Sequence, residues 1–258
     1  MSKIPESIRI SVVIIAKNEA YNLQRLLPSV SWADEILVAD TGSNDATAES
    51  AEKLGARVIE LSWEGFGKTK QKAVNAAKYD WILSIDADEE VSAALQNKLL
   101  DMRADLNENN AYKLKRISWY LGKKIMHCGW QYDMPLRFFN RRTASFNNKV
   151  VHEGVKTKMP VSIIKEPIYH YTYPLLSDHL EKINLYTSLN VEQKFLKGRR
   201  YTVSGAIMQG MWKFLTMYVF KMGYLDGLAG FLLCYNSAYG QYLKYLKLWE
   251  HRRNDLTH

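Results

Sequence analysis

A short apolar run that leads directly into four carboxylates constrains this chain more than any other feature. Residues 81–85, WILSI, read as a buried strand, and residues 86–90, DADEE, follow without a break. So much negative charge at the end of a buried strand is costly unless a cation or a set of hydrogen-bond donors compensates it. The segment therefore predicts either a functional site or the acidic first turn of a helix, since Asp and Glu also favour helix N-termini.

The spacing of Asp86 and Asp88 favours a site. In an extended segment, residues i and i+2 point to the same side, so we expect the two carboxylates to converge on one object. Oxygen ligands from a few carboxylates suit a hard divalent ion such as Mg²⁺ or Mn²⁺, especially one shared with phosphates. The pattern predicts a metal-assisted phosphate site at the end of this strand.

Strands and helices alternate through the N-terminal half of the chain. The predicted strands cover residues 8–16, 35–39, 57–61 and 81–85, with helical spacing between them. This alternation is typical of a parallel α/β sheet with right-handed crossovers, in which ligands bind beyond the carboxyl ends of the strands. Polar residues stand at those ends: Asn18, Glu19, Asp40, Asp86 and Asp88. Neither a dinucleotide fingerprint nor a P-loop motif is present.

Local signals mark several helix boundaries. Pro28 is expected to end or kink the first helix, and Ser43 or Asn44 can cap the second, which should stop at Gly55. Ser92 is expected to cap a helix that follows the acidic segment. These signals place the polar clusters in loops between regular elements.

Length and composition indicate a globular protein with a sizeable core. The chain has 258 residues, of which 47% are hydrophobic and 12% aromatic, which argues against disorder. Two cysteines far apart, Cys128 and Cys234, favour a reducing compartment without a disulfide framework. The first residues lack the apolar core of a secretory signal, so we expect a cytoplasmic protein.

The pattern changes after residue 105. Residues 112–120, 136–139, 144–150 and 161–169 read as antiparallel strands beside the parallel sheet, where an acceptor pocket would form. Residues 177–196 read as an amphipathic helix, and 201–250 are rich in aromatic residues. We therefore expect three segments: a nucleotide-binding half at 1–105, an acceptor-side half at 106–175, and a helical region at 176–258.

The C-terminal region carries most of the positive charge. The net charge is +8, and residues 191–258 contain ten Lys and Arg against four Asp and Glu. Two apolar stripes run through this region, one of them through Met208, Met211, Trp212, Leu215 and Val219, but no stretch of about twenty uncharged apolar residues spans a bilayer. We expect interfacial helices on an anionic membrane, with packing on the catalytic domain or self-association as the alternative. Nucleic acid is not an expected partner, because apolar stripes interrupt the basic residues.

Three N-terminal motifs resemble the nucleotide-sugar domain of glycosyltransferase family 2, which has the GT-A fold. They are SVVIIAKNE at 11–19, LVADTGSNDAT at 37–47 and SIDADE at 84–89. Further motifs resemble the bacterial lipopolysaccharide-core β-1,4-glucosyltransferase subgroup: GFGKTK at 65–70, VHEG at 151–154, YHYTY at 169–173 and KLWE at 247–250. The resemblance implies an α/β fold with a mixed, mainly parallel sheet and a C-terminal helical segment.

The resemblance also implies roles for the residues at the strand ends. Asp40 would contact the uracil ring, and Asn18 or Glu19 would line the nucleotide pocket. Asp86 would face the ribose, and Asp88 would coordinate Mg²⁺ or Mn²⁺ on the diphosphate. Such a cation acts as a Lewis acid toward the leaving phosphate.

The remaining roles are carried by residues outside the three N-terminal motifs. Glu153 is the expected general base, with Asp133 as the second choice. His170 would complete the metal shell, unless it is a packed histidine of structural role. Lys72 would assist the phosphates, unless it lies on a solvated helix face, and Arg137 would hold a phosphate or form a structural ion pair.

These expectations combine into one function. We expect a metal-dependent inverting transferase that moves a hexose, with glucose from UDP-glucose as the best choice, onto a lipid-linked saccharide at the cytoplasmic face of the inner membrane. The inner core of lipopolysaccharide is the expected acceptor. The alternatives are a sugar-phosphate nucleotidyltransferase and a non-catalytic module that binds sugar nucleotides.

Overall fold

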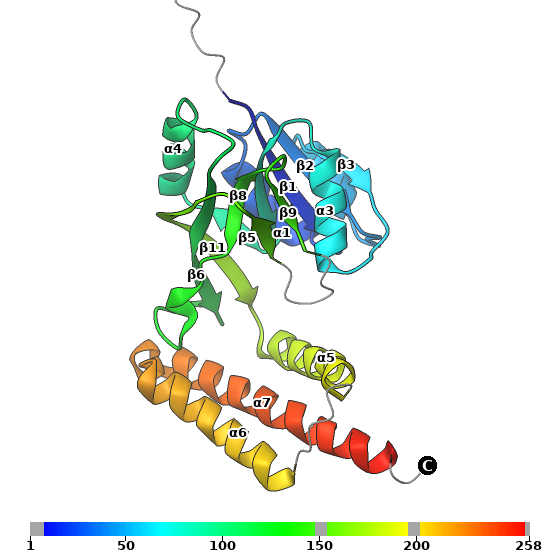
Figure 1. The fold of residues 1–258 in the computed structure, drawn as a ribbon, viewed down its shortest axis with the longest axis vertical. Helices are drawn as coiled ribbons and strands as arrows, with labels where there is room; N and C mark the ends of the chain where they lie inside the picture. Colours follow the sequence, from blue (N-terminus) through cyan, green and yellow to red (C-terminus); the bar gives the residue numbers. More distant parts are fainter. Residues whose placement is uncertain (1–7, 148–153, 196–201, 256–258) are drawn as a thin grey trace, which may run out of the picture. The chain divides into compact units, whose positions relative to one another are not determined.

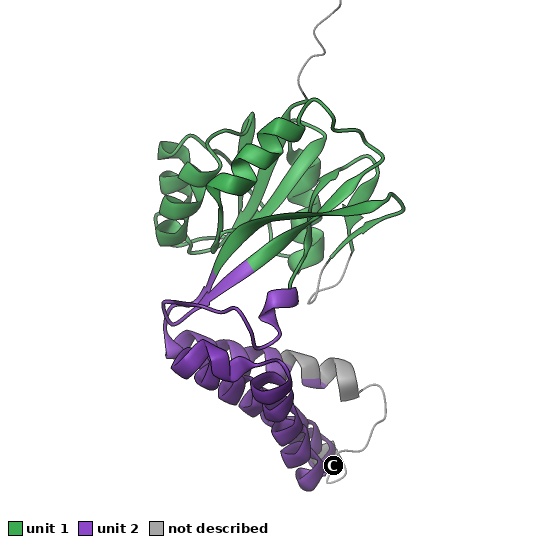
Figure 2. Ribbon diagram, turned by 90° about the vertical axis from the view of Figure 1, so that its left-hand side faces the viewer, with its two compact units in different colours: residues 1–116, 133–170 green, residues 117–132, 171–258 purple. Residues whose placement is uncertain are grey.

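The computed structural model describes residues 8–147, 154–195 and 202–255. The chain divides into two compact units, residues 1–116 with 133–170 and residues 117–132 with 171–258 (Figure 2). The second unit thus takes in residues 117–132 as well as the predicted helical region. The three segments expected from the sequence stay a prediction.

A mixed sheet forms the centre of the fold (Figure 1). Its strands, in spatial order, are β3 (Arg57–Glu60), β2 (Glu35–Asp40), β1 (Ile10–Ala16), β4 (Trp81–Asp86), β8 (Leu136–Asn140), β6 (Ala111–Tyr120), β11 (Val161–Tyr173) and β5 (Glu89–Val91), with β7 (Lys123–Lys124) paired to β6. The first four strands are parallel, and β8 runs antiparallel beside β4. A separate pair is formed by β9 (Ala144–Phe146) and β10 (Val155–Thr157). The expectation of a mixed, mainly parallel sheet is confirmed.

Helices cover both faces of the parallel strands, which explains why β1 is apolar except at Ser11, whose hydroxyl donates to the Glu35 carboxylate. Buried leucines of α1 (Ala20–Ser29) and α4 (Ala93–Met102) pack in one core, together with α2 (Thr47–Lys53). Ala73 and Val74 of α3 (Phe66–Ala76) pack in the other core. The sheet is therefore closed on both sides, and its open region is the edge where the strands end.

The strand register brings the polar clusters to that edge. Asp40 pairs with Ala16, the last residue of β1, and Asp86 pairs with Ile15. The predicted strand ends therefore meet in space. Pro28 lies one residue before the end of α1, and Ser92 caps α4 by accepting a hydrogen bond from the Leu95 N–H at 3.1 Å, both as expected.

The predicted cap of α2 is wrong, and the alternative of a helix start in the acidic segment is excluded. Neither Ser43 nor Asn44 caps α2, which begins at Thr47; the Asp45 carboxylate accepts from the Thr47 N–H at 3.0 Å instead. The acidic segment does not open a helix, because residues 87–88 form a turn and β5 follows. The turn also breaks the extended alternation expected from Asp86 to Asp88, and it arises because β5 must turn to pair with β11, where Glu89 lies opposite His170.

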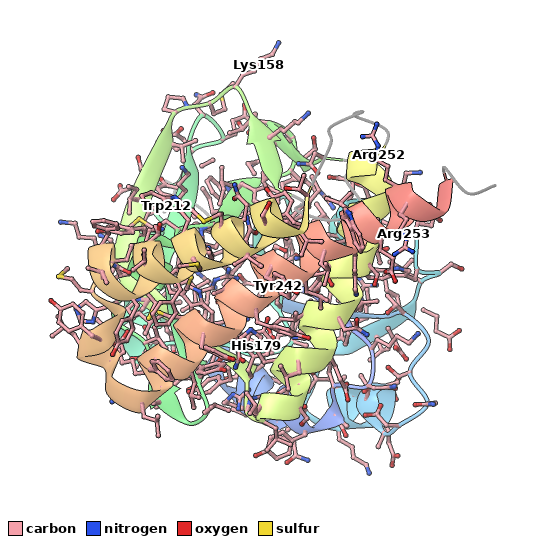
Figure 3. The ribbon with its side chains drawn as sticks, turned by 90° about the horizontal axis from the view of Figure 1, so that it is seen from below. Lys158, His179, Trp212, Tyr242, Arg252 and Arg253 are labelled. Carbon is pink, nitrogen blue, oxygen red and sulfur yellow. The ribbon has the colours of Figure 1, made fainter. Side chains whose placement is uncertain are left out.

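The second unit is built around α7 (Gly227–Asp255), with α5 (Leu176–Phe195) and α6 (Val203–Leu215) packed beside it (Figure 3). Short helical turns connect these elements: η1 (Trp130–Tyr132), the π-helical η2 (Thr216–Phe220) and η3 (Gly223–Asp226). A Cβ added at Gly210 would lie 3.0 Å from the Cβ of Tyr242, so a glycine is what lets α6 and α7 approach closely.

The predicted apolar stripe of α6 faces away from α7. Ala206 and Gly210 are buried, whereas Met208 is 63% exposed and Trp212 is 61% exposed. Among the described residues, no single helix has the length and hydropathy of a membrane span; the segments Val203–Phe220 and Gly223–Arg253, bent by 73° at their junction, reach those values only when taken together.

Candidate active site

Two loops at the carboxyl ends of β1 and β2 bind each other through side chains. The Asp40 carboxylate accepts hydrogen bonds from the Ser43 N–H at 3.0 Å and from the Ser43 hydroxyl at 2.6 Å. The Asn18 N–H donates to the Ser43 hydroxyl at 2.9 Å, and the Asn18 side-chain oxygen accepts from the Asn44 N–H at 2.9 Å. Asn18 adopts a φ of 57°, a left-handed conformation that asparagine tolerates. Ser43 and Asn44 thus join the two predicted nucleotide loops, which is why they do not cap α2.

Glu19 lies beside the same two loops, but its carboxylate contacts α1, the helix that follows it. Its N–H donates to the Thr47 hydroxyl at 2.8 Å, and its carboxylate accepts from the Asn22 side chain at 2.6 Å. The structure therefore brings Asn18 and Asp40 together around Ser43, with Glu19 at the start of α1.

Asp86 lies between two buried cations. Its carboxylate is 2.6 Å from the Lys70 ammonium and also pairs with the Arg137 guanidinium. Both cationic side chains are almost fully buried, whereas Asp86 is half-buried. The cost of ending a buried strand in a carboxylate is thus offset by cations from α3 and β8, elements about 15 and 50 residues away.

The charges continue into a second layer. Glu89, which is fully buried, accepts from the Asp86 N–H at 2.9 Å and lies 3.2 Å from the Arg116 guanidinium and 3.6 Å from that of Arg137. Arg116 also pairs with Asp133, whose carboxylate accepts from the Arg116 Nε at 2.8 Å. Three carboxylates and three cations therefore alternate through this network.

The network keeps Asp86 ionised. Burial alone would raise the pKa of Asp86, but the charges of Arg137 and Lys70 outweigh it and hold that pKa well below its ordinary value of 3.8. Burial would likewise lower the pKa of Arg116, and the neighbouring Glu89 carboxylate more than compensates, so that this pKa is raised. The shifts of both pKa values favour the charged forms of Asp86 and Arg116.

Asp88 lies beside a histidine. The His170 Nε2 is 3.3 Å from an Asp88 carboxylate oxygen, and both side chains are partly exposed. The pairing of β11 with β5 brings them together across about 80 residues of sequence. Among the described residues, no group of three or more His, Cys, Asp or Glu side chains could by itself hold a metal ion. The chain thus offers a pair of adjacent ligand-type side chains at this point.

The lysine beside Asp86 is Lys70 rather than Lys72. Lys70 is 3% exposed and shares the inner face of α3 with Gly67, Ala73 and Val74. The Lys72 side chain is 48% exposed and pairs with Glu64 on the outer side. Gly67, Lys70 and Ala73 are spaced three residues apart, which places them on one face of a helix. This spacing could have identified Lys70 as the inward-facing lysine, but only if the helix had been predicted to begin at Phe66.

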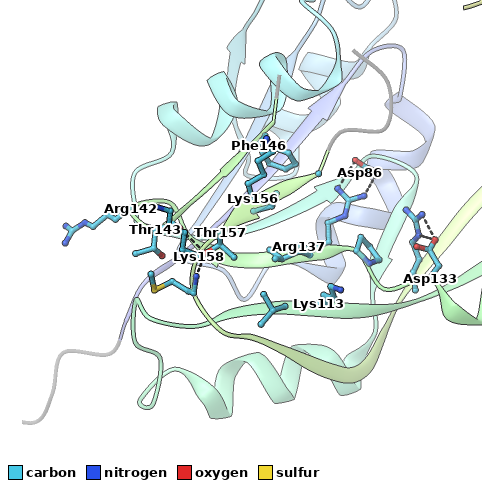
Figure 4. Close-up of a pocket in the computed structure, with 17 residues that line it drawn as sticks. Asp86, Lys113, Asp133, Arg137, Arg142, Thr143, Phe146, Lys156, Thr157 and Lys158 are labelled. Carbon is cyan, nitrogen blue, oxygen red and sulfur yellow. Dashed lines mark hydrogen bonds and ion pairs between the residues drawn. The ribbon is translucent and has the colours of Figure 1, made fainter. Parts of the chain in front are cut away.

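A large cavity lies beside Asp86 in the first unit (Figure 4). Its volume is about 1230 Å³, and Arg116, Asp133, Arg137 and Phe146 contribute to its walls. The predicted second choice for the base, Asp133, therefore lines a cavity that also contains Asp86. The preferred base, Glu153, lies outside the described residues.

Comparisons with known proteins identify the family of the chain. The model of the family "Glycosyl transferase family 2" matches residues 11–157. An uncharacterized glycosyltransferase of Rickettsia bellii is 30% identical over 254 residues, which cover 94% of this chain and 86% of that protein. The lipopolysaccharide core biosynthesis glycosyltransferase LpsC of Rhizobium meliloti is 25% identical over 248 residues, which cover 93% and 92%.

Solved structures give a more distant likeness. Glucosyl-3-phosphoglycerate synthase from Mycobacterium tuberculosis, crystallised with Mn²⁺, UDP and glucosyl-3-phosphoglycerate, shares 26% identity over 43% of this chain and 44% of that chain, with a TM-score of 0.36. TarS of S. aureus shares 15% identity over 86% and 46%, with a TM-score of 0.48. The family model covers more than half of the sequence and carries the conclusion: the chain belongs to glycosyl transferase family 2 and is a glycosyltransferase.

Proposed function

We propose that this glycosyltransferase moves a hexose from a UDP-sugar, glucose from UDP-glucose in the first instance, to a lipid-linked saccharide of the cell envelope with inversion at the anomeric carbon. One observation carries the proposal. The joined loops of Asn18 and Asp40, the pair of Asp88 and His170, and the cavity beside Asp86 all belong to one sheet of the first unit. Ligands of such sheets bind beyond the carboxyl ends of the strands.

The donor nucleotide would occupy the corner formed by β1, β2 and β4. Asn18 and Asp40 offer an amide and a carboxylate of fixed orientation, which suit the polar edge of a uracil ring. Asp86 stays ionised and would accept hydrogen bonds from the ribose hydroxyls. The uracil site would thus lie at the ends of β2 and β1, and the ribose site at the end of the neighbouring β4.

The pair of Asp88 and His170 fits a divalent cation. A carboxylate oxygen and an imidazole nitrogen 3.3 Å apart supply two ligands of the type that Mn²⁺ or Mg²⁺ accepts when phosphate oxygens and water provide the others. When bound, such a cation neutralises the charge that develops on the leaving diphosphate. His170 would also orient the Asp88 carboxylate through their direct contact, with or without a bound cation.

The transfer itself would be one displacement. The acceptor hydroxyl oxygen forms a bond to the anomeric carbon as the bond from that carbon to the diphosphate breaks, and the hydroxyl proton passes to a carboxylate. We assign this carboxylate to Glu153, with Asp133 as the second choice. Asp133 lines the cavity, and Arg116 holds it in place. Turnover should fall in Glu153→Gln and persist in Asp133→Asn; the reverse result reassigns the base.

The acceptor would be presented at the cytoplasmic face of the inner membrane. Apolar side chains of α6 and of the start of α7 stand exposed, including Met208, Trp212 and Leu228. An exposed apolar face suits an interface with lipid, and the positive charge of the C-terminal region suits anionic lipid. The name of the relative from Rhizobium meliloti supports the inner core of lipopolysaccharide as the acceptor.

Membrane contact has its own test. Sedimentation with phosphatidylglycerol vesicles should recover the wild-type protein, whereas the double variant Met208→Gln/Trp212→Gln should bind at least about tenfold more weakly, because two side chains no longer enter the lipid. Tyr21→Gln, an exposed aromatic residue of the first unit, is the control. Equal binding of all three proteins removes this face from the proposal.

Release of UDP tests the catalytic proposal. A panel of UDP-sugars is incubated with the full chain and Mn²⁺, Mg²⁺ or a chelator, with and without deacylated lipopolysaccharide as acceptor. We expect metal-dependent release of UDP from one sugar, faster with acceptor, and a product of inverted anomeric configuration. A parallel incubation supplies UTP and a sugar 1-phosphate, and release of diphosphate there identifies a nucleotidyltransferase. If neither UDP nor diphosphate is released under any condition, the protein is a binding module.

A further inference from the structure

The cavity beside Asp86 has far more cationic than anionic side chains. Six cationic residues line it and only two anionic ones, Asp86 and Asp133. Three of the cations have counter-charges: Arg116 pairs with Asp133, Arg137 with Asp86, and Arg142 with Asp80 at 2.6 Å. The excess positive charge therefore comes from the three lysines, Lys113, Lys156 and Lys158.

We call Lys113, Lys156 and Lys158 the cationic rim. All three side chains are exposed, and none of them forms an ion pair with another residue in the part of the chain that the structure describes. Three like charges around one cavity repel each other, and low-dielectric walls concentrate their field inside it. An anionic group that enters the cavity relieves this repulsion.

The rim is held in place by the fold. Lys113 lies on β6 opposite Leu136, next to the Arg137 that binds Asp86. The turn that carries Lys158 is fixed by the Thr157 hydroxyl, which donates to the Thr143 carbonyl and accepts from the Met159 N–H, each at 3.0 Å. Figure 4 shows Lys113 and Lys156 on strands beside the cavity and Lys158 in the turn that follows β10.

A further hydrogen bond ties the rim together, because the Ala111 N–H donates to the Pro160 carbonyl at 3.0 Å and so joins the turn to β6. The lysines are thus presented from a rigid frame. Because the backbone that carries the lysines is already ordered, little backbone conformational entropy is lost when an anion binds.

The turn that carries Lys158 lies far from the residues assigned to the donor diphosphate. Val161, which lines the cavity next to this turn, and His170 are nine residues apart on β11. Nine residues of extended strand span up to about 30 Å. Lys113 lies on β6, between this turn and the charged network. The Lys158 end of the rim is therefore remote from Asp88 and His170, on the side that remains for an acceptor.

From this placement we infer that the cationic rim binds oxyanions, phosphate or carboxylate, on the saccharide acceptor beyond the hydroxyl that reacts. Lysines act as point charges toward such groups and tolerate more than one anion geometry. The inference rests on the proposed function, because it names the acceptor class for the same cavity. It predicts that a neutral saccharide of equal length is a poor acceptor.

Binding of a defined oligosaccharide tests the inference without requiring turnover. The probe is deacylated lipopolysaccharide inner-core oligosaccharide, used intact, after removal of its phosphates, and after reduction of its carboxyl groups. Calorimetry compares the full-length protein with the triple variant Lys113→Gln/Lys156→Gln/Lys158→Gln. The control is Lys78→Gln/Lys98→Gln, which changes two exposed lysines that do not line the cavity.

We expect the triple variant to bind the intact oligosaccharide at least tenfold more weakly, with a smaller dependence on salt, while its affinity for UDP stays within twofold of wild type. Loss of affinity on removing phosphate, or on reducing the carboxyl groups, identifies the oxyanion that the rim binds. Unchanged binding by the triple variant overturns the inference. An equal loss of UDP affinity overturns it too, because the lysines then serve the donor.

The two proposals fail in different ways. If no UDP-sugar is turned over but the triple variant still loses the oligosaccharide, the transferase assignment of donor and acceptor fails and the anion site remains. If UDP-sugar is turned over normally and the triple variant accepts the oligosaccharide with an unchanged KM, the rim has no part in acceptor recognition.

Discussion

The two units of this chain bury polar side chains in opposite ways. In the first unit, Asp86 pairs with Lys70 and Arg137, and both Asp86 and Arg137 line a large cavity. In the second unit, the Tyr120 hydroxyl lies 3.0 Å from the His179 Nδ1 and accepts a hydrogen bond from the Asn236 side chain at 3.1 Å, all three residues being buried. Neutral, mutually satisfied groups stabilise a core, whereas a charged network beside a cavity provides fixed charges that can act on a ligand.

The two units also differ in the side chains that they expose, which are charged in the first unit and apolar in the second. The first unit places its unpaired charge around a cavity, in the cationic rim. The second unit places aromatic and sulfur-containing side chains outward on α6 and keeps its small residues against α7. This difference supports our proposal that the first unit carries the chemistry and that the second unit contributes a neutral core and an exposed apolar face.

The largest effect on stability should come from breaking the charged network. Replacing Lys70 by Met leaves Asp86 with one fewer counter-charge in a buried setting, so we expect the free energy of unfolding to fall by about 3 kcal/mol. Lys72→Met, two residues away on the exposed side of the same helix, should change it by about 0.5 kcal/mol or less. Urea denaturation measures both. Equal effects would show that the burial of Lys70 has no energetic consequence.

The second prediction concerns Asp88, which follows the same strand as Asp86, and it distinguishes a loss of catalysis from a loss of stability. Asp88→Ala should lower UDP-sugar turnover about 100- to 1,000-fold, because a ligand that stabilises developing charge is lost. Its unfolding free energy should fall by no more than about 1 kcal/mol, since the Asp88 carboxylate is partly exposed. Asp101→Ala, an exposed carboxylate on α4, serves as the control. Full metal-dependent turnover by Asp88→Ala removes the metal role of this residue.

The pH dependence of stability should divide between the two units. Burial lowers the pKa of His179 from 6.5 to about 4, so the folded state keeps it neutral while the unfolded state takes up a proton below pH 6.5. Stability from this group is complete above pH 6.5 and is lost as the pH falls toward about 4, by ~3 kcal/mol in all. Chemical denaturation of His179→Gln across this range should show a flatter profile than wild type.

Asp86 should act in a lower window. Its folded pKa lies well below the unfolded value of 3.8, so its contribution is present above about pH 4 and disappears as the pH falls further. Asp86→Asn should therefore flatten the profile below pH 4 and leave the His179 window unchanged. A change in the upper window instead would contradict the assignment of that window to the second unit.

The smallest effect tests the neutral cluster. Tyr120→Phe removes the hydroxyl that both His179 and Asn236 contact, and we expect a loss of about 1–2 kcal/mol in unfolding free energy, the cost of leaving buried polar groups without a partner. Tyr21→Phe, whose ring is exposed, should have no measurable effect. Thermal denaturation of the three proteins compares them.

Local sequence patterns determined much of the first unit. The β-branched run of β1 and the alternation after it indicated a parallel sheet, and the strand ends placed Asn18, Asp40 and Asp86 at one edge. The Ser92 cap followed from a residue and its neighbour three positions away. Such features depend on interactions within a few residues, which the order of amino acids specifies directly.

Only the tertiary structure decided which charges meet. Arg137 reaches Asp86 across 51 residues, and His170 reaches Asp88 because β11 pairs with β5. No local spacing distinguishes Lys70 from Lys72 until the start of α3 is fixed, and no periodicity tells whether the stripe of α6 faces a core or solvent. The sequence by itself determined the sheet and the acidic strand end; long-range pairing, which joins residues far apart in the chain, decided the partners of each charge.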